Sequence, residues 1–272
     1  MQRFHKILVG VDLSSADRLA ASELNPPTVE AVRRALWLAE HLSSSLTFFS
    51  ALDVSARTRE LLQDRFEQAT RTVEDEANRV LAELVDRAKQ QGIAAEGKFV
   101  FGKSWVEIIR QVLREQHDLV ITGTRDIGAP GRLLFDSTGM KLLRYCPCPV
   151  WVTKPDPDWN TMNVLVSSDL SEVSQDALNM AVNSGQLVDA KIQLVHSIEH
   201  HLDRRIWHTG LSEEEIQAFR EKTRADAEHQ LHQHLSQTGH RTLKQGVELH
   251  VAEGPAEVVI LEAIDEYQID CW

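Results

Sequence analysis

Cysteine is scarce in this sequence: 272 residues contain three, Cys146, Cys148 and Cys271. A sparse and odd count does not make the disulfide framework of a small secreted domain. Reduced thiols in a reducing compartment are the simpler interpretation. Cys146-Pro147-Cys148 could be a metal or redox pair, but one residue separates the cysteines where such pairs usually have two. We therefore interpret this segment as structural.

Long apolar runs and clusters of basic residues are also missing. No stretch approaches the roughly 20 apolar residues that span a bilayer. The formal net charge is -12, which would repel both nucleic acid and an anionic membrane surface. The segment MQRFHKILVGVDLSS lacks the apolar length and cleavage site of a signal peptide. We expect a cytoplasmic protein whose partners are neither nucleic acid nor membrane.

The common catalytic motifs are absent: there is no G-x-S-x-G, no HExxH and no P-loop lysine motif. We therefore expect no enzyme activity and no catalytic residues. The segment HQLHQH places His229 and His232 on one helical face and His234 elsewhere. A solvated polar face explains these histidines better than a metal site, so no metal is expected.

The sequence does contain an internal repeat. KILVGVDLSS, with Asp12, returns as NVLVSSDLSE, with Asp169. GKSWVEII from Gly102 returns as GPAEVVIL from Gly254, and QHDLV returns as QIDCW. Similar offsets over several segments indicate a duplicated domain. The Pro- and Asp-rich segment TKPDPDWNTM is typical of a linker, so we expect domains over residues 1–155 and 160–272.

Strands and helices alternate in the first domain. The patterns predict strands over residues 6–11, 46–54, 93–101, 119–122 and 150–153, and helices over residues 28–42, 58–91, 104–115 and 137–145. Ser104 and Glu107 have the spacing of a capping box. Such alternation predicts an α/β fold with an open parallel sheet of five strands. The second domain repeats this fold but lacks its last strand. Ligands of such sheets bind beyond the carboxyl ends of the strands.

These segments resemble the universal stress proteins. The resemblance rests on VDLS after the first strand, the helix start GKSWVEII, the junction DLVITGT and the terminal CPCPVWVTK. The duplication resembles the tandem, E-type members of that family. It implies two nucleotide α-hydrolase-like, Rossmann-like domains that pair within one chain. In the family this pairing uses the last strand of each domain, and here the second domain offers no such strand. The resemblance also implies that CPV is an ordinary strand entry.

ATP-binding members of the family carry a loop of pattern G-x2-G-x9-G-S/T, in which glycines let backbone N–H groups approach phosphates. Aligned on Gly123, this chain has Asp126 and Asp136 at the other two glycine positions, followed by Ser137. Each aspartate adds a side chain and a negative charge where a polyphosphate would lie. We expect that the first domain does not bind ATP in the usual pose, although Arg125 could bind another anion.

The resemblance also implies the candidate residues for ligand or nucleotide binding. Asp12 and Asp169 follow the first strand of each half, where the family's Asp meets adenine or ribose; a turn hydrogen bond is the alternative. Ala51 and Ser197 close the second strands, where plain core packing is the alternative. The full set is Asp12, Ala51, Thr122, Gly123, Arg125, Ser137, Thr138, Asp169 and Ser197.

The sequence thus indicates a non-catalytic stress-response protein that binds a small ligand or a protein partner. The first alternative is an ATP-binding, nucleotide-dependent switch, and the second is a hydrolase or transferase related to the nucleotide α-hydrolases. No cofactor is required by the first interpretation, and ATP is the cofactor of the alternative. We expect pairing of the two domains within the chain, and a homodimer is a further possibility. An apolar groove near Leu202, Ile206, Trp207 and Leu211 could hold a hydrophobic ligand, but core packing is favoured.

Overall fold

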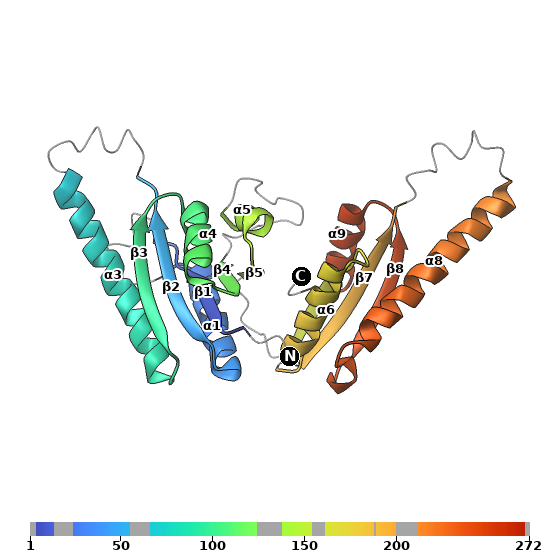
Figure 1. Ribbon diagram of the computed structural model, residues 1–272, viewed down its shortest axis with the longest axis horizontal. Coiled ribbons are helices and arrows are strands. Elements are labelled where there is room, and N and C mark those ends of the chain that lie inside the picture. The colour runs from blue at the N-terminus through green and yellow to red at the C-terminus, as the bar shows by residue number, and fades with distance from the viewer. Residues whose placement is uncertain are drawn as a thin grey trace. The chain divides into compact units, whose positions relative to one another are not determined.

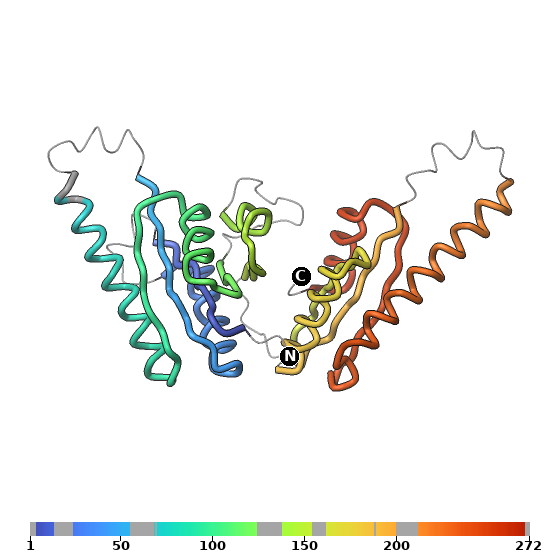
Figure 2. Tube along the Cα trace, in the orientation of Figure 1, coloured from blue at the N-terminus to red at the C-terminus, as the bar shows by residue number. Residues whose placement is uncertain are grey.

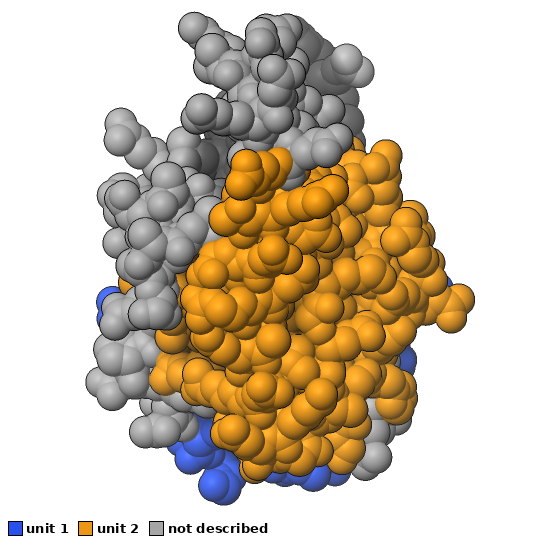
Figure 3. Space-filling view, turned by 90° about the vertical axis from the view of Figure 1, so that its left-hand side faces the viewer, with its two compact units in different colours: residues 1–2, 158–272 blue, residues 3–157 orange. Residues whose placement is uncertain are grey.

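The computed structural model describes residues 4–13, 24–54, 66–123, 138–153, 161–187, 189–199 and 212–269. The chain divides into two compact units, an amino-terminal unit of residues 3–157 and a carboxyl-terminal unit that begins at residue 158 (Figure 3). This division falls inside the Pro- and Asp-rich segment between the expected domains 1–155 and 160–272.

The amino-terminal unit is a parallel sheet of five strands in the order β3-β2-β1-β4-β5. This confirms the predicted fold class. The predicted strand 46–54 ends two residues early, and the predicted helix 58–91 is described from residue 66, because residues 55–65 lie outside the described ranges. In chain order the elements are β1 (Lys6–Gly10), α1 (Pro26–Leu42), β2 (Ser45–Leu52), α3 (Phe66–Gln90), β3 (Ala95–Phe101), α4 (Ser104–Glu115), β4 (Leu119–Gly123), α5 (Thr138–Tyr145) and β5 (Val150–Thr153).

Helices cover both faces of this sheet, as the continuous buried runs of β1 and β4 require. Leu8, Phe49 and Val120 point to one face, where they pack against Ile108 of α4 and Leu142 of α5. Helices α1 and α3 pack against the strands from the other side, and Figure 1 shows α1 and α4 separated by the sheet.

The carboxyl-terminal unit repeats this arrangement with a smaller parallel sheet, in the order β6-β7-β8. Helices α6 and α8 share one apolar cluster with the sheet, and α9 packs on the opposite face against Leu165 and Val195. The repeated segment QIDCW spans residues 268–272, and its last three residues lie outside the described ranges. The elements are β6 (Thr161–Ser167), α6 (Glu172–Gly185), β7 (Asp189–Ile198), α8 (Glu213–Ser236), β8 (Val247–Glu253) and α9 (Ala256–Glu266). The long helices α3 and α8 take corresponding places in their units (Figure 2).

The junction between the third strand and the following helix is the same in both units. The N–H of Gly102 donates to the carbonyl of Leu52, and the N–H of Gly254 donates to the carbonyl of Ile198. Both glycines have positive φ, 154° and 140°, which L side chains rarely adopt. The repeated glycine of GKSWVEII and GPAEVVIL therefore has a backbone cause.

The predicted capping box at Ser104 is wrong. Lys103 occupies the N-cap of α4 without a side-chain cap, and Ser104 is the first helical residue. The Ser104 hydroxyl instead donates to the carbonyl of Ala51, at 3.0 Å, so it ties α4 to the end of β2. Glu107 folds over Gly102, where the missing side chain leaves room, and pairs with Arg110 at 2.6 Å.

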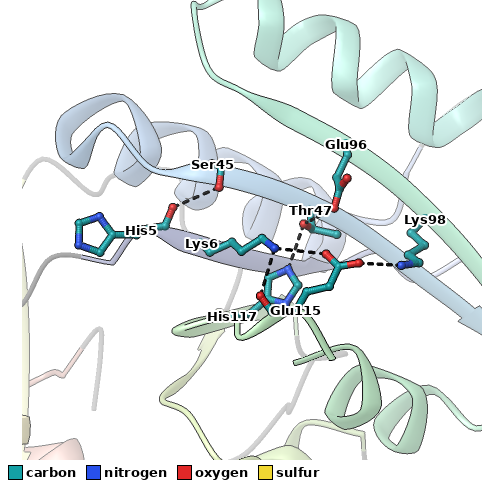
Figure 4. A network of polar contacts seen from close by, with 8 residues as sticks. All are labelled: His5, Lys6, Ser45, Thr47, Glu96, Lys98, Glu115 and His117. Carbon is teal, nitrogen blue, oxygen red and sulfur yellow. Dashed lines mark hydrogen bonds and ion pairs between the residues drawn. The ribbon is translucent and has the colours of Figure 1, made fainter. Parts of the chain in front are cut away.

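A polar network closes the amino ends of the strands in the amino-terminal unit (Figure 4). Glu115 accepts from Lys98 at 2.8 Å and from Lys6 at 3.4 Å. His117 lies at 3.0 Å from the hydroxyl of Thr47, which in turn donates to Glu96. This edge is opposite to the one at which ligands of such sheets bind. Within the described ranges, no helix has both the length and the apolar character needed to cross a membrane.

Candidate ligand site at the carboxyl ends of β1 and β4

Strand β1 is the switch point of the amino-terminal sheet. The chain runs from β1 outward to β2 and β3 on one side, and then returns to β4 and β5 on the other. In open α/β sheets the connections diverge at such a point, and ligands bind beyond the carboxyl ends of the strands there. Asp12 follows β1, and Thr122 and Gly123 end β4, so three of the predicted residues lie at this edge of the sheet.

The amino end of α1 packs against this edge of the sheet. Asn25 caps the helix, and its side-chain oxygen accepts from the N–H of Thr28 at 2.7 Å. Pro26 and Pro27 follow at the first two helical positions, where a missing N–H costs nothing. Asn25 and Thr28 are both buried, so the start of α1 is held in one place.

Asp12 is bound to this helix start. Its N–H donates to the hydroxyl of Thr28 at 3.4 Å, and its carboxylate accepts from the side-chain amide of Asn25 at 3.4 Å. The sequence interpretation did not include Asn25 and Thr28. An Asn directly before Pro-Pro is a strong N-cap signal and could have identified the first of them.

Gly123 is required by packing. A Cβ atom at this position would lie 2.2 Å from the carbonyl oxygen of Pro27, so β4 can meet the first turn of α1 only through a glycine. A Cβ at Gly10 would lie 3.0 Å from the Thr122 hydroxyl. The resemblance implies that Gly123 serves phosphate binding, and the structure adds a steric reason for the same residue.

The remaining candidates of this unit are less closely grouped. Ala51 is half-buried in β2, packs against the apolar cluster beneath α4, and offers its carbonyl to Ser104. Thr138 is the first residue of α5. Arg125 and Ser137, with Asp126 and Asp136, lie outside the described residues.

In the carboxyl-terminal unit, Asp169 closes a local turn. Its carboxylate accepts from the N–H of Ser171 at 3.0 Å, the turn hydrogen bond that the sequence interpretation held as the alternative. Hydrogen bonds from Ser171, the hydroxyl first and then the backbone, hold the pKa of Asp169 below its ordinary value. The Ser171 side chain also caps α6 by accepting from the N–H of Ser174.

Ser197 and His196 lie at the end of β7. The Ser197 hydroxyl donates to the carbonyl of Gly254, so it joins β7 to the start of α9. The Nδ1 of His196 lies 2.8 Å from the carbonyl of Ser168. These contacts give both side chains a place in the framework of the unit.

The histidines of HQLHQH lie on α8. His229 and His232 are exposed, and His229 lies 3.0 Å from the side chain of Gln233, as a solvated helix face predicts. Among the residues that the structure describes, no three His, Cys, Asp or Glu side chains are grouped so that they could hold a metal ion. The apolar residues Leu202, Ile206, Trp207 and Leu211 lie outside the described ranges.

Comparison with known proteins identifies the family of this chain. The profile of the universal stress protein family matches residues 3–154 and again residues 160–271. The chain belongs to this family. The double match also confirms the tandem arrangement that the internal repeat predicts.

Universal stress proteins that are similar to this chain include curated relatives and solved structures. Universal stress protein E of Photorhabdus laumondii is 27% identical over 66% of this chain and 55% of its own length. Universal stress protein E of Escherichia coli (strain K12) is 26% identical over 74% of this chain and 60% of its own. A universal stress protein from Archaeoglobus fulgidus has the same fold, with a TM-score of 0.60, 18% identity, and coverage of 97% of this chain and 82% of that one. The match therefore spans 55% to 60% of these two curated relatives.

Proposed function

We propose that this universal stress protein is a non-catalytic binding protein, and that its amino-terminal unit binds a small polar ligand at the carboxyl ends of β1 and β4. The observation that carries this proposal is the position of Asp12. Its carboxylate lies at the switch point of the sheet, against the capped start of α1. A carboxylate there favours a ligand that donates hydrogen bonds, such as the hydroxyls of a nucleoside.

The ligand of this site carries no triphosphate. Asp126 and Asp136 occupy the glycine positions of the phosphate loop. Two like charges about 4 Å apart repel by about 4 kcal/mol at an effective dielectric near 20, and that corresponds to roughly three decades of affinity. This argument favours ligand binding or protein binding over the ATP-dependent switch.

In this proposal the carboxyl-terminal unit holds no second ligand site. Asp169 uses its carboxylate in its own turn, and Ser197 uses its hydroxyl on Gly254. Pairing of the two halves within the chain, a homodimer and a cytoplasmic location remain predictions of the family resemblance.

A calorimetric titration with adenosine, AMP and Mg-ATP tests the proposal on the whole chain. We expect wild-type protein to bind adenosine or AMP more tightly than Mg-ATP. Asp12→Asn keeps the shape but removes the charge and should weaken that binding roughly tenfold, since a hydrogen bond to a charged group contributes about 1.5–3 kcal/mol.

Asp169→Asn is the matched control, because it changes the corresponding residue of the other unit. It should leave the affinity unchanged. Equal losses in the two variants, or a Mg-ATP affinity above that for AMP, would contradict the proposal. Slow release of phosphate from Mg-ATP by wild-type protein, absent in Asp12→Asn, would favour the enzyme class instead.

A further inference from the structure

Two thiols face each other between α5 and β5. The sulfur atoms of Cys146 and Cys148 are 3.7 Å apart, within hydrogen-bond distance for sulfur. Both side chains are half-buried. On their inner side they pack against the apolar cluster that contains Val120 and Leu142. Pro147 between them and Pro149 after them are exposed, so solvent reaches this segment from outside.

The backbone holds the pair from both ends. The N–H of Cys146 donates to the carbonyl of Leu142 at 2.8 Å, which extends the last turn of α5. The carbonyl of Pro149 accepts from the N–H of Val120 at 3.0 Å, which fixes the entry into β5. Pro147 has a fixed φ angle. The two sulfurs are therefore brought together by the fold, even though one residue separates them in sequence.

We propose that Cys146 and Cys148 are a redox-active dithiol, which a small hydroperoxide oxidises reversibly to an intramolecular disulfide. This site is independent of the ligand site at Asp12. It also revises the interpretation of the segment as purely structural. That interpretation rested on the motif spacing and on the family's CPV strand entry, and the distance between the sulfurs is the better criterion.

The two thiols differ in acidity because they share one proton. Either sulfur can be the donor across this contact; with the S–H of Cys148 as the donor, the hydrogen bond lowers the pKa of Cys146 to about 7. The same hydrogen bond, with burial, raises the pKa of Cys148 well above its ordinary value. At neutral pH, Cys146 thus supplies the thiolate and Cys148 the protonated partner. A low-pKa thiol beside a resolving thiol is the usual arrangement of redox-sensing cysteines.

The chemistry proceeds in two steps. The Cys146 thiolate attacks one peroxide oxygen, the O–O bond breaks, and the products are the sulfenic acid of Cys146 and, after uptake of a proton, water or an alcohol. The Cys148 sulfur then attacks the sulfenic sulfur, forms the S–S bond and expels a second water. Two thiols lose two electrons and the hydroperoxide gains them. The sulfurs need to approach from 3.7 Å to about 2.05 Å, and a thiol reductant reverses the reaction.

Peptide mapping after peroxide treatment tests this proposal on the full chain. Cys271→Ser removes the third thiol and serves as the background. Tryptic cleavage leaves Cys146 and Cys148 together in the peptide of residues 145–191, which contains no other cysteine. We expect this peptide to lose two hydrogen atoms on oxidation and to regain them with dithiothreitol. Addition of two or three oxygens to either cysteine without the disulfide would overturn the proposal.

Single substitutions in that background separate the two roles. In Cys148→Ser the sulfenic acid of Cys146 should persist and react with dimedone. In Cys146→Ser the reaction with peroxide should slow roughly tenfold, because Cys148 alone has little thiolate at neutral pH. Iodoacetamide should modify Cys146 with half-maximal rate near pH 7. Equal rates in the two variants would contradict the assignment of Cys146 as the nucleophile.

Discussion

The two units place polar side chains at corresponding positions of their sheets but use different chemistry there. Strand β2 pairs with β3 as β7 pairs with β8, with Leu46 opposite Ala95 and Ile192 opposite Val247. Thr47 and Glu96 therefore correspond to Gln193 and Glu248, and each pair is hydrogen-bonded, at 3.2 Å and 3.0 Å. Both units have this contact and its glutamate, although Gln193 stands where the first unit has Thr47.

The next contact along the strand shows the larger change. In the amino-terminal unit, Lys98 pairs with Glu115. In the carboxyl-terminal unit the corresponding residues are His250 and Tyr267, whose rings stack with centroids 4.5 Å apart. The Tyr267 hydroxyl also lies 3.3 Å from Nδ1 of His250. The position at the end of α4 in one unit and of α9 in the other is thus filled by an ion pair in the first case and by stacked rings in the second.

The carboxyl ends of the sheets differ in a second way. Asp12 makes contacts to the start of α1, whereas Asp169 closes a turn with Ser171 in front of α6. In the amino-terminal unit, β4 also meets α1 through Gly123. The same repeated Asp thus belongs to an edge shared by several elements in one unit and to a local turn in the other.

We expect the largest loss of stability from a substitution of Gly123, which lies at the edge that is specific to the amino-terminal unit. In Gly123→Ala the new Cβ would lie 2.2 Å from the carbonyl oxygen of Pro27, so β4 and α1 must separate. We expect a loss of about 3 kcal/mol of unfolding free energy. Gly139→Ala is the control, since its Cβ would meet Val152 at an ordinary 3.6 Å; it should stabilise α5 slightly. Thermal unfolding of both variants checks this, and equal melting temperatures would refute the packing argument.

Removal of the two helix caps sharpens the comparison. Asn25→Ala removes the cap of α1 together with the amide that Asp12 accepts from, so it should cost about 2 kcal/mol. Ser171→Ala removes the cap of α6 and should cost about 1 kcal/mol. Hydrogen exchange resolved by peptide measures each helix separately. A larger effect at α6 than at α1 would contradict the account of the two edges.

Substitutions of Glu115 and Tyr267 test whether charge stabilises the contact in the amino-terminal unit but not the one in the carboxyl-terminal unit. Interactions with Lys98, Gln111 and Lys6 lower the pKa of Glu115 from 4.5 to about 2. A carboxylate with a lowered pKa stabilises the fold fully above its unfolded pKa, and this contribution is lost as the pH falls toward 2. Glu115→Gln should therefore cost about 1 kcal/mol at neutral pH and progressively less below about pH 4.

Tyr267→Phe is the matched variant in the carboxyl-terminal unit. It removes one hydroxyl contact and keeps the stacked rings, so we expect a loss of about 0.5 kcal/mol. Added salt screens ion pairs, and it should reduce the cost of Glu115→Gln while leaving that of Tyr267→Phe in place. Calorimetry at low and high salt measures both, and the same salt dependence in the two variants would remove the distinction.

Of these predictions, the one for His117 concerns the smallest contribution to stability. Burial first, and then the charge of Lys6, lower the pKa of His117, while Glu115, Glu96 and the backbone of Gln111 partly oppose this. Because the folded pKa lies below the unfolded one, this histidine stabilises the fold above about pH 6.5, and that contribution declines as the pH falls below this value. An NMR titration of the imidazole should give a pKa under the ordinary 6.5. A value above it would contradict the buried, neutral state.

The sequence predicts the sheets and helices well because their signals are local. Apolar periodicity and the Pro26-Pro27 entry suffice for α1, and the repeated glycines Gly102 and Gly254 identify the shared junction. The capping box at Ser104 was wrong because a contact with Ala51, 53 residues away in sequence, competes with the local pattern.

The sequence pattern did not reveal the contacts that build the site, because these contacts also join separate elements of the chain. Asn25 reaches Asp12 across 13 positions, and Pro27 meets Gly123 from a distant element. Spacing alone did not reveal that the sulfurs of Cys146 and Cys148 lie within contact of each other. Such contacts follow from how the elements pack, and not from the order of residues within one of them.

The most direct test of the proposed function is a calorimetric titration of Mg-ATP into the wild-type chain and into Asp126→Gly/Asp136→Gly. We predict no saturable binding of Mg-ATP to wild type up to about 1 mM, and a gain of roughly three decades in the glycine variant once both charges are removed. Micromolar binding of Mg-ATP to the wild-type chain would contradict the account.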